Sequence, residues 1–475
     1  MSAVTGNSKA GLALLNLSAW IRRQGWMRLI YRVFPQPLRS RLSGWLASRV
    51  SAGARFVRTE NWNTWVPTQA DISLEAQPNV DAAIGVNILG YMRGQFGLAE
   101  SARMYARALK ASGIPVALHD IDLNLPHGWN DHSVDRWLGE EMPYPVSVIF
   151  VNPDYLQPAL EQIGKARLEG RYLIACWFWE LERIPDEWLP ALALVDEIMV
   201  ASAFIEKAFR RVTDKPILRV PLPVAPGPDS GLQRADFGLE EGKFIFLTTF
   251  DFNSWIGRKN PVAAVEAFRL AFPGKRDDVR LVVKSSNGFR YPEKLGTLLN
   301  LAAPDSRIII RDDLIDRAHI SALQRCCDAY VSLHRAEGFG LGLAECMRLG
   351  KPVIATGWSG NMEYMTAGNS CLVDYDLIPV GEGEYLHHQG QRWADPDISH
   401  AAKYMRRLVA DPKFKAKIGA QAAFDVREKL SPQVASQKII QRLQVLSSTP
   451  EACAPSGAAA AKARAHPTHQ QARLE

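Results

Sequence analysis

The sequence predicts an α/β protein made of two domains that face each other across a cleft. Apolar strands alternate with amphipathic helices twice along the chain, first from Asn79 and again from Lys243, and this alternation is typical of parallel sheets covered by helices. Residues 217–231 carry four prolines between the two series and are expected to be the interdomain linker. At 475 residues the chain is also long for a single hydrophobic core.

The first series opens with a predicted strand–loop–helix–strand unit. A strand over residues 80–91 leads through a loop containing Gly94 and Gly97 into a helix over residues 98–113, and a strand over residues 114–121 follows. The glycines of this loop do not have the GxGxxG spacing of a dinucleotide site. The loop is therefore a candidate phosphate or acceptor loop.

Glu180 is a further candidate site residue in the first series, because it directly follows a predicted strand. Open α/β sheets bind ligands outside the carboxyl ends of their strands. The remaining elements predicted for this half are strands over residues 146–151, 171–177 and 195–202, a helix from Pro185 and a helix over residues 203–212.

The second series repeats the same alternation. A strand over residues 243–252 is followed by a loop over residues 253–261 and a helix whose first turn follows Pro261. The later elements are short strands beginning at Val279, Ser306 and Asp328, a helix over residues 314–326, a strand from Lys351, and helices over residues 398–409, 412–429 and 432–446.

The most informative motif lies in residues 334–365. Glu337 and Glu345 stand with seven residues between them around a glycine-rich turn that opens a helix. A helix that begins at such a turn presents unpaired backbone N–H groups and the positive end of its dipole, which attract phosphate oxygens. The ligand that this motif predicts is a nucleotide diphosphate. The turn consists of Gly338, Phe339 and Gly340, and the helix begins at Leu341.

Arg258 and Lys259 are predicted to lie at the same edge of the second sheet as the motif. They end the loop after the first strand of that domain, and two cations there would stabilise the negative charge of a leaving diphosphate. We expect them to face the two glutamates across the phosphates. Asn253, in the same loop, and Lys284, in the strand from Val279, are further candidate donor-binding residues.

These residues together resemble family 4 retaining glycosyltransferases of the GT-B type. EGFGLGLAE matches that family's E-x7-E motif, supported by TGWSGNMEYM downstream and by RKN before a helix. The resemblance covers about residues 79–446. Within the family, the sequence is similar in particular to the bacterial mannosyltransferase-like branch that builds polysaccharide repeat units. It implies two Rossmann-like domains, an acceptor held by the first and a nucleotide-sugar donor held by the second, retention of anomeric configuration, and no metal ion or other cofactor.

The resemblance also implies a role for each motif residue. Glu337 matches the glutamate near the donor sugar hydroxyls and Glu345 the one near the ribose, while Phe339 and Gly340 offer amides to the diphosphate and Lys259 is the phosphate-binding lysine. Two positions depart from the family pattern. An arginine expected five or six residues before Lys259 is replaced by Ser254 or Asn253, so either Arg258 substitutes for it or the second cation is missing. The histidine expected at the first domain's strand edge is replaced by the segment WFWE, which contains Glu180.

Charge is unevenly distributed along the chain. Ten of the 56 basic residues precede the first acid, Glu60, although the net charge is only +6. Aromatic and aliphatic residues accompany these arginines over residues 12–58, a combination that suits a helix lying on an anionic membrane surface. A basic helix packed on the body of the protein, or a poorly ordered leader, is the alternative.

The remaining composition excludes several classes of protein. Six scattered cysteines form no CxxC pair and predict neither a disulfide framework nor a zinc site. No apolar run is long enough to span a bilayer, and the short apolar piece over residues 11–20 does not resemble a secretory signal. We therefore expect a cytoplasmic protein that contacts the inner face of the membrane if residues 12–58 bind lipid. We expect no nucleic-acid partner.

The sequence predicts five segments and one leading function, and the resemblance implies the acceptor and donor roles of the two domains and the return of the last helix to the first domain. The segments are a basic extension and linker (1–78), an acceptor domain (79–225), a donor domain (226–430), a helix crossing back to the first domain (431–448) and a disordered tail (449–475). The function is transfer of a hexose, with mannose as one candidate, from a nucleotide diphosphate sugar to a glycan or lipid-linked glycan. A non-catalytic sugar-nucleotide-binding protein and an NAD-dependent oxidoreductase remain as alternatives.

Overall fold

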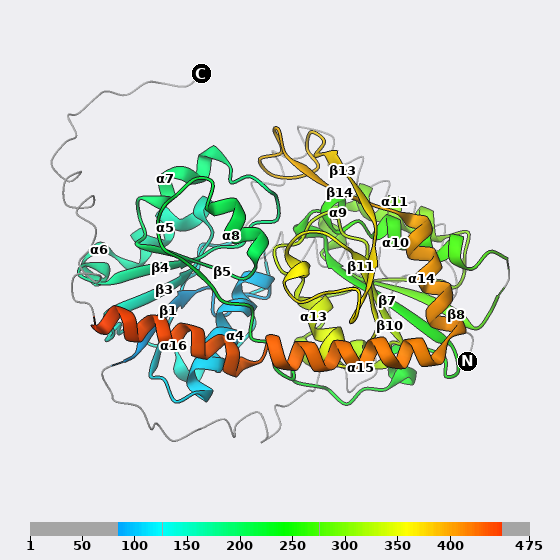
Figure 1. Cartoon of the computed structure of the whole chain (residues 1–475), viewed down its shortest axis with the longest axis horizontal. Helices are drawn as coiled ribbons and strands as arrows, with labels where there is room; N and C mark the ends of the chain where they lie inside the picture. Colours follow the sequence, from blue (N-terminus) through cyan, green and yellow to red (C-terminus); the bar gives the residue numbers. More distant parts are fainter. Residues whose placement is uncertain (1–83, 126, 275, 449–475) are drawn as a thin grey trace, which may run out of the picture. The chain divides into compact units, whose positions relative to one another are not determined.

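The computed structural model describes residues 84–125, 127–274 and 276–448. Within them the chain forms two compact α/β units (Figure 1). The C-terminal unit comprises Pro226–Arg427, and the N-terminal unit comprises the described residues up to Ala225 together with those from Glu428 onward. The predicted membrane-surface segment, the linker before residue 79 and the predicted tail lie outside the described residues.

The N-terminal unit is built on a six-stranded parallel sheet with the order β2-β1-β3-β4-β5-β6. Its central strands are buried along their whole length, as expected of a parallel sheet covered on both faces. The strands are β1 (Val86–Gly90), β2 (Val116–Asp120), β3 (Val146–Phe150), β4 (Tyr172–Cys176), β5 (Glu197–Val200) and β6 (Ile217–Arg219).

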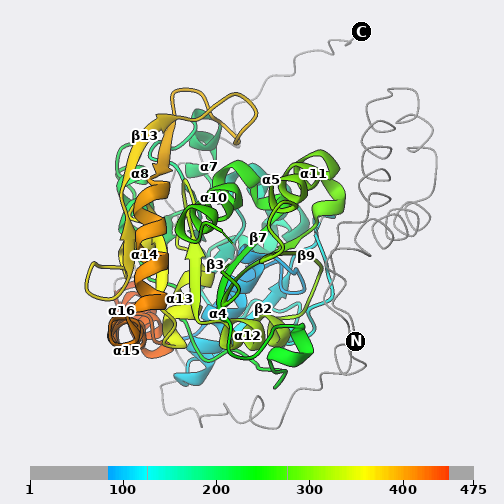
Figure 2. The ribbon, with the colours of Figure 1, turned by 90° about the vertical axis from the view of Figure 1, so that its right-hand side faces the viewer.

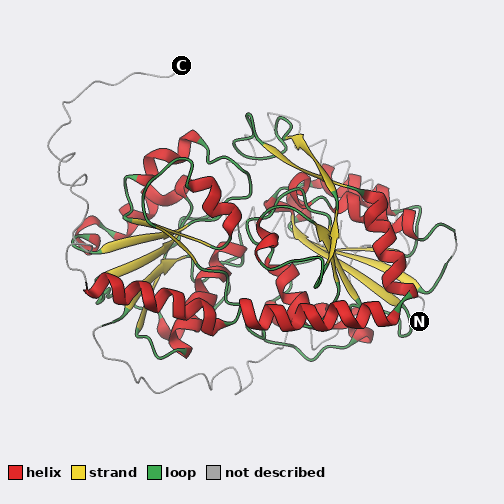
Figure 3. Ribbon diagram, in the orientation of Figure 1, coloured by secondary structure: helices red, strands yellow, loops and turns green. Residues whose placement is uncertain are grey.

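Helices of the N-terminal unit follow the predicted alternation and pack on this sheet (Figure 3). Helix α16 packs against α4, and the hydroxyls of Ser112 and Ser436 lie 2.7 Å apart between them. The helices are α4 (Gly97–Ala111), η4 (Asp135–Trp137), α5 (Pro153–Ile163), α6 (Lys165–Leu168), η5 (Asp186–Trp188), α7 (Leu189–Leu192), α8 (Ala203–Phe209) and α16 (Pro432–Ser448).

The C-terminal unit contains a second parallel sheet with the order β12-β11-β10-β7-β8-β9. A separate antiparallel pair, β13 and β14, follows it in the chain. The strands are β7 (Phe244–Asp251), β8 (Val279–Ser286), β9 (Ile308–Asp312), β10 (Ala329–Ser332), β11 (Val353–Thr356), β12 (Cys371–Val373), β13 (Tyr375–Pro379) and β14 (Arg392–Pro396).

Helices of the C-terminal unit close its core. Helix α14 packs against α10 (Figure 2), and both contribute to one apolar cluster with β7, β8 and β10. The helices are η6 (Arg234–Phe237), η7 (Phe252–Ser254), α9 (Ile256–Lys259), α10 (Pro261–Ala271), η8 (Gly288–Arg290), α11 (Pro292–Ala302), α12 (Arg317–Cys326), α13 (Leu341–Arg348), η9 (Gly360–Glu363), α14 (Ile398–Ala410) and α15 (Pro412–Lys429).

Several sequence predictions need correction. The predicted linker begins inside the N-terminal unit, because residues 217–219 pair with β5 as the edge strand β6 and Val220 and Leu222 are buried. The predicted loop over residues 253–261 contains the short helices η7 and α9. The predicted helix from Pro185 is two short turns, and α5, α6, α11, β12, β13 and β14 were not predicted.

In the described part of the chain, no helix is both long and apolar enough to cross a bilayer.

Candidate functional site

The candidate site lies where the order of the second sheet reverses. The order of the strands reverses between β7 and β10, which are parallel neighbours in the sheet although they are far apart in sequence. The loops that follow two such strands leave the sheet in opposite directions and open a crevice, which is where doubly wound sheets bind ligands. The loop after β7 carries Arg258 and Lys259, and the loop after β10 carries Glu337.

Arg258 and Lys259 both contact the Glu337 carboxylate. Lys259 Nζ donates to one carboxylate oxygen, and Arg258 Nη1 lies 3.2 Å from the other and 2.9 Å from the Ala336 carbonyl oxygen. The expectation that the cations and the carboxylate face one another across a ligand is therefore replaced by a direct ion-paired cluster. We call Arg258, Lys259 and Glu337 the charged triad.

Glu337 is buried, with 6% of its surface exposed, yet it is ionised at neutral pH. Burial works to raise the pKa of its carboxyl group. The charges of Lys259 and Arg258 outweigh burial and lower that pKa from 4.5 to about 2. The charged triad therefore carries two positive charges and one negative charge, so it retains one net positive charge that favours an anion beside it.

The backbone of α9 is shaped around these two cations. Trp255 precedes the helix with φ of +63°, a conformation that bulky residues rarely adopt. Asn260 ends α9 in the left-handed region, and its side chain accepts from the Ala263 amide to cap α10. Two unusual backbone conformations therefore bracket the pair Arg258–Lys259, and strain of this kind is commonly found at functional sites.

The predicted glycine turn is present and leads into α13. Gly340 is the N-cap residue, with φ of +84°, and α13 has neither a side-chain cap nor an acidic residue in its first turn. By contrast, α10, α12 and α14 each have a capping side chain. The Leu343 amide donates to the Gly340 carbonyl at 3.1 Å, and a helix N-terminus with neither a side-chain cap nor an acid in its first turn is suited to an anion.

The loop after β11 holds the turn in place. The Glu337 amide donates to Ser359 Oγ at 2.9 Å, and the Gly360 amide donates to the Glu337 carbonyl at 2.8 Å. Tyr364 is buried and its hydroxyl lies 2.7 Å from the Gly340 carbonyl oxygen. Ser359, Gly360 and Tyr364 belong to the segment TGWSGNMEYM. No individual role was predicted for them, although they follow the next strand at the same edge of the sheet.

His334 links the loop after β10 to the loop after β11. Its Nε2 lies 3.1 Å from Asn361 Oδ1, while Asn361 Nδ2 donates to the Thr356 carbonyl. Since Asn361 presents its oxygen to the ring, Nε2 carries the proton and Nδ1 accepts from Ser332 Oγ at 3.0 Å. Burial lowers the pKa of His334, so the neutral ring that this pattern needs is favoured.

Glu345 is bound by two side chains from α12. Arg317 donates to one of its oxygens and Gln324 Nε2 donates to the other at 2.9 Å. Arg317 and Gln324 are seven residues apart and therefore lie on one face of their helix. Their spacing was the available sequence signal, but neither residue was predicted as part of the site.

Lys284 and Asn253 make contacts other than those of the charged triad. Lys284 is buried on β8 and donates to the Asp313 carbonyl at 2.8 Å, and burial lowers its pKa. Asn253 accepts from the Tyr291 hydroxyl at 3.2 Å. Their predicted donor contacts remain predictions.

The other predicted residues belong to the N-terminal unit. Gly94 is buried, and its carbonyl accepts from the buried Arg103 guanidinium at 2.8 Å. Gly97 begins α4, and Glu180 follows β4 and is partly buried. The loop with the two glycines therefore leaves the sheet at β1, beside β3, which is the point where the order of the first sheet reverses.

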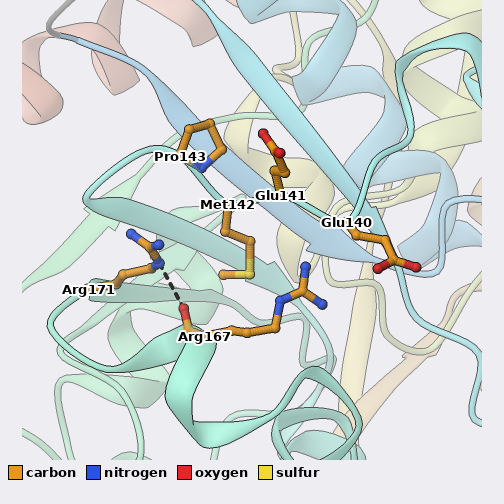
Figure 4. A pocket seen from close by; sticks show the side chains of 6 residues that line it. All are labelled: Glu140, Glu141, Met142, Pro143, Arg167 and Arg171. Carbon is orange, nitrogen blue, oxygen red and sulfur yellow. Dashed lines mark hydrogen bonds between the residues drawn. The ribbon is translucent and has the colours of Figure 1, made fainter.

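A hollow of about 560 Å³ lies at a different place in the N-terminal unit (Figure 4). Arg167 and Arg171 line one side of it, and Arg171 Nε donates to the Arg167 carbonyl at 2.8 Å. The other lining residues are Glu140, Glu141, Met142 and Pro143. This hollow is near the amino ends of β3 and β4, opposite the carboxyl ends where such sheets bind ligands.

Comparison with known proteins places a family match on the candidate site. Residues 251–382 match the family described as "Glycosyl transferases group 1". That stretch contains the charged triad, the turn and Glu345, and it ends before β14. A trehalose synthase from Rubrobacter xylanophilus is 24% identical over 198 residues, which are 41% of this chain and 41% of that protein. The match thus spans about two fifths of the curated relative.

Solved structures share the fold over most of the chain. A sucrose-phosphate synthase from Thermosynechococcus elongatus matches with a TM-score of 0.56 and 16% identity, covering 77% of this chain and all of that one. HepE of Anabaena, in complex with UDP and glucose, matches with a TM-score of 0.52 and 17% identity, covering 76% and 100%. The fold is therefore that of GT-B proteins, with two Rossmann-like domains.

Proposed function

We propose that this protein transfers a hexose from a nucleotide diphosphate sugar to a glycan or lipid-linked glycan, with retention of anomeric configuration and without a metal ion. The observation that carries the proposal is the charged triad beside the uncapped N-terminus of α13. The donor would bind to the C-terminal unit and the acceptor to the N-terminal unit. Mannose is a candidate sugar, in keeping with the resemblance to polysaccharide-building mannosyltransferases.

The chemistry needs stabilisation of a leaving diphosphate. As the bond between the sugar and the diphosphate breaks, negative charge develops on a phosphate oxygen, and fixed positive groups stabilise that charge in the transition state. Lys259 has three N–H donors, so it can keep its contact with Glu337 and donate to a phosphate oxygen as well. The first-turn amides of α13 would supply further donors.

The two glutamates would orient the donor. Glu337 accepts hydrogen bonds only, since its low pKa keeps it ionised, and it would accept from sugar hydroxyls. Glu345 is held by Arg317 and Gln324 and would accept from the ribose diol. Both glutamates would therefore act as positioning groups for the donor, and the charge stabilisation would come from Arg258, Lys259 and α13.

The proposal is tested by donor hydrolysis. Purified protein is incubated with UDP-glucose, UDP-N-acetylglucosamine and GDP-mannose, and release of the nucleoside diphosphate is measured. Uridine donors come first because HepE binds UDP. We expect Lys259→Ala and Glu337→Ala each to lower turnover by about 10²–10³-fold.

Lys243→Ala is the matched control. Lys243 also pairs with a carboxylate, Asp277, but it lies before β7 at the other end of that strand. Turnover in this variant should equal that of the wild type. Full activity of both Lys259→Ala and Glu337→Ala would overturn the proposal, and donor binding without turnover would favour the non-catalytic binding protein.

Membrane contact is a separate proposal that rests on the sequence of residues 12–58. Deleting the residues before Trp62 should weaken binding to anionic liposomes and leave donor hydrolysis unchanged. Equal liposome binding with and without the segment would overturn it.

A further inference from the structure

The β13–β14 hairpin packs against the helix that carries Arg258. Its connecting loop closes where the Val380 amide donates to the Gln391 carbonyl at 3.0 Å. A Cβ added to Gly257, in α9, would lie 3.6 Å from the Glu384 backbone oxygen and 3.5 Å from the Trp393 ring. The loop and β14 are therefore in van der Waals contact with α9.

Two aromatic rings of this hairpin face two arginines of the site. The Arg258 guanidinium lies 5.7 Å from the centre of the Tyr385 ring, and the Arg335 guanidinium lies 5.3 Å from the centre of the Trp393 ring. Tyr385 and Trp393 are both buried. A desolvated cation within about 6 Å of an aromatic face is attracted to it by the ring quadrupole. The hairpin therefore supplies electrostatic contacts to Arg258 as well as packing.

The same hairpin is joined through the backbone to Glu337. The Ala394 amide donates to the Arg335 carbonyl at 3.0 Å, and the Arg335 amide donates to the Arg258 carbonyl at 2.8 Å. Arg335 is two residues before Glu337, so β14, Arg258 and Glu337 form one hydrogen-bonded sequence. A change in the hairpin is thus expected to alter the geometry of the charged triad.

The family match ends at residue 382, before Tyr385, Trp393 and β14. From these contacts we infer that Tyr385 is a positioning residue for the proposed glycosyl transfer, which holds the Arg258 guanidinium on Glu337, while Trp393 supports the same hydrogen-bonded sequence through Arg335. The inference rests on the proposed function. The hairpin would then contribute to the chemistry through Arg258.

The decisive variants change the Tyr385 ring. Loss of the ring in Tyr385→Leu frees the guanidinium to leave Glu337, so kcat for donor hydrolysis should fall about tenfold. The KM for the same donor should change less than about threefold, because the ring acts on charge stabilisation in the transition state. Tyr385→Phe keeps the aromatic face and should stay within about threefold of wild type.

A cycle with Arg258 separates positioning from general stability. In an Arg258→Ala background, Tyr385→Leu should change kcat by less than about twofold, since there is no guanidinium left to hold. Leu386→Ala is the matched control, because Leu386 is the next residue of the same loop and is 48% exposed. Equal losses in both backgrounds, or equal losses for Tyr385→Leu and Tyr385→Phe, would overturn the inference.

The same four variants of the cycle are also compared by their urea midpoints, which need no donor. If the two substitutions shift the urea midpoint non-additively, the contact between Tyr385 and Arg258 is supported. If their shifts add, the contact is overturned. If the midpoint shifts are non-additive but the wild-type protein hydrolyses none of the three donors, the proposed function is overturned, and with it the hairpin's part in the chemistry. The failure of either idea is thereby distinguished from the failure of the other.

Discussion

At the scale of single residues, the charge state of Glu337 links the site to stability. Its carboxyl group is buried between two cations, which lower its pKa from 4.5 to about 2. A carboxyl group whose pKa is lower in the folded state stabilises that state above its unfolded pKa, and the contribution disappears as the pH falls through the folded pKa. The contribution of Glu337 should therefore be complete above pH 4.5 and be lost between pH 4.5 and 2.

Glu337→Gln tests this pH dependence. Above pH 4.5 the variant should be less stable than the wild type by about 3 kcal/mol, because two buried cations lose their counter-charge. The difference in unfolding free energy should shrink towards pH 2. Urea unfolding of both proteins from pH 6 to pH 2 measures it, and a difference that stays constant over that range would contradict the lowered pKa.

The positions of the site residues along the sheet edge were easier to predict from the sequence than their side-chain partners. Glu337, Arg258 and Lys259 could be placed at one edge because each follows a parallel strand. Their direct contact could not, because it joins side chains 78 and 79 positions apart in the chain. The partners of Glu345, Arg317 and Gln324, lie on a helix that was predicted, but the sequence does not show which face of that helix meets α13.

At the scale of elements, the loops after β10 and β11 pack backbone against backbone. A Cβ on Gly360 would lie 1.9 Å from the Gly338 carbonyl oxygen and 2.7 Å from that of Glu337. Backbone atoms cannot yield as a flexible side chain can. The two loops would have to separate, and the turn before α13 would move with them.

Gly360→Ala is therefore expected to destabilise the protein by about 1–3 kcal/mol and to weaken donor hydrolysis. Gly368→Ala is the control, because an added Cβ there meets only Thr366 Oγ1, at 3.7 Å, and it should change the midpoint little. Thermal unfolding and donor turnover are measured for both. A Gly360→Ala variant as stable as Gly368→Ala would contradict the close packing of the two loops.

The central buried strands were predictable at this scale, whereas the helices α5 and α11 and the short or irregular elements were not predicted. Buried parallel strands are near-continuous apolar runs, and they were identified in both halves. β13 and β14 have the sequences YDLIP and RWADP, in which acids and prolines hide the alternation of a strand. Helix α9 has only four residues and follows Trp255 in an unusual conformation, so no helical period could be recognised there.

At the scale of the whole molecule, the described part of the chain passes between the two units twice. It leaves the N-terminal unit at Ala225 and returns at Glu428. The returning helix α16 buries Ala435, Ile439, Leu443 and Leu446 in that unit. The N-terminal unit therefore takes part of its core from the end of the described chain, and its stability depends on a segment more than 200 residues away in sequence.

Arg442 is the polar contact that most clearly fixes α16. Its guanidinium binds the Glu197 carboxylate at 2.7 Å through Nη2 and at 2.9 Å through Nε, and the Tyr172 hydroxyl donates to the same carboxylate at 3.0 Å. Glu197 is only 1% exposed, so removing its partner leaves a buried charge. Arg442→Ala should destabilise the N-terminal unit by about 3 kcal/mol.

A second substitution tests the physical reason for that loss. Glu197→Gln in the Arg442→Ala background removes the buried charge and should restore part of the stability, which a loss of packing alone would not allow. Lys438→Ala, on the same helix but only partly buried and with a long 3.3 Å hydrogen bond to the Arg219 carbonyl, should change stability by less than about 0.5 kcal/mol. Hydrogen exchange of the α4 and α16 amides reads these effects within the N-terminal unit. If Arg442→Ala leaves that exchange unchanged, α16 is held by its apolar face alone and the ion pair contributes nothing to keeping the returning helix in place.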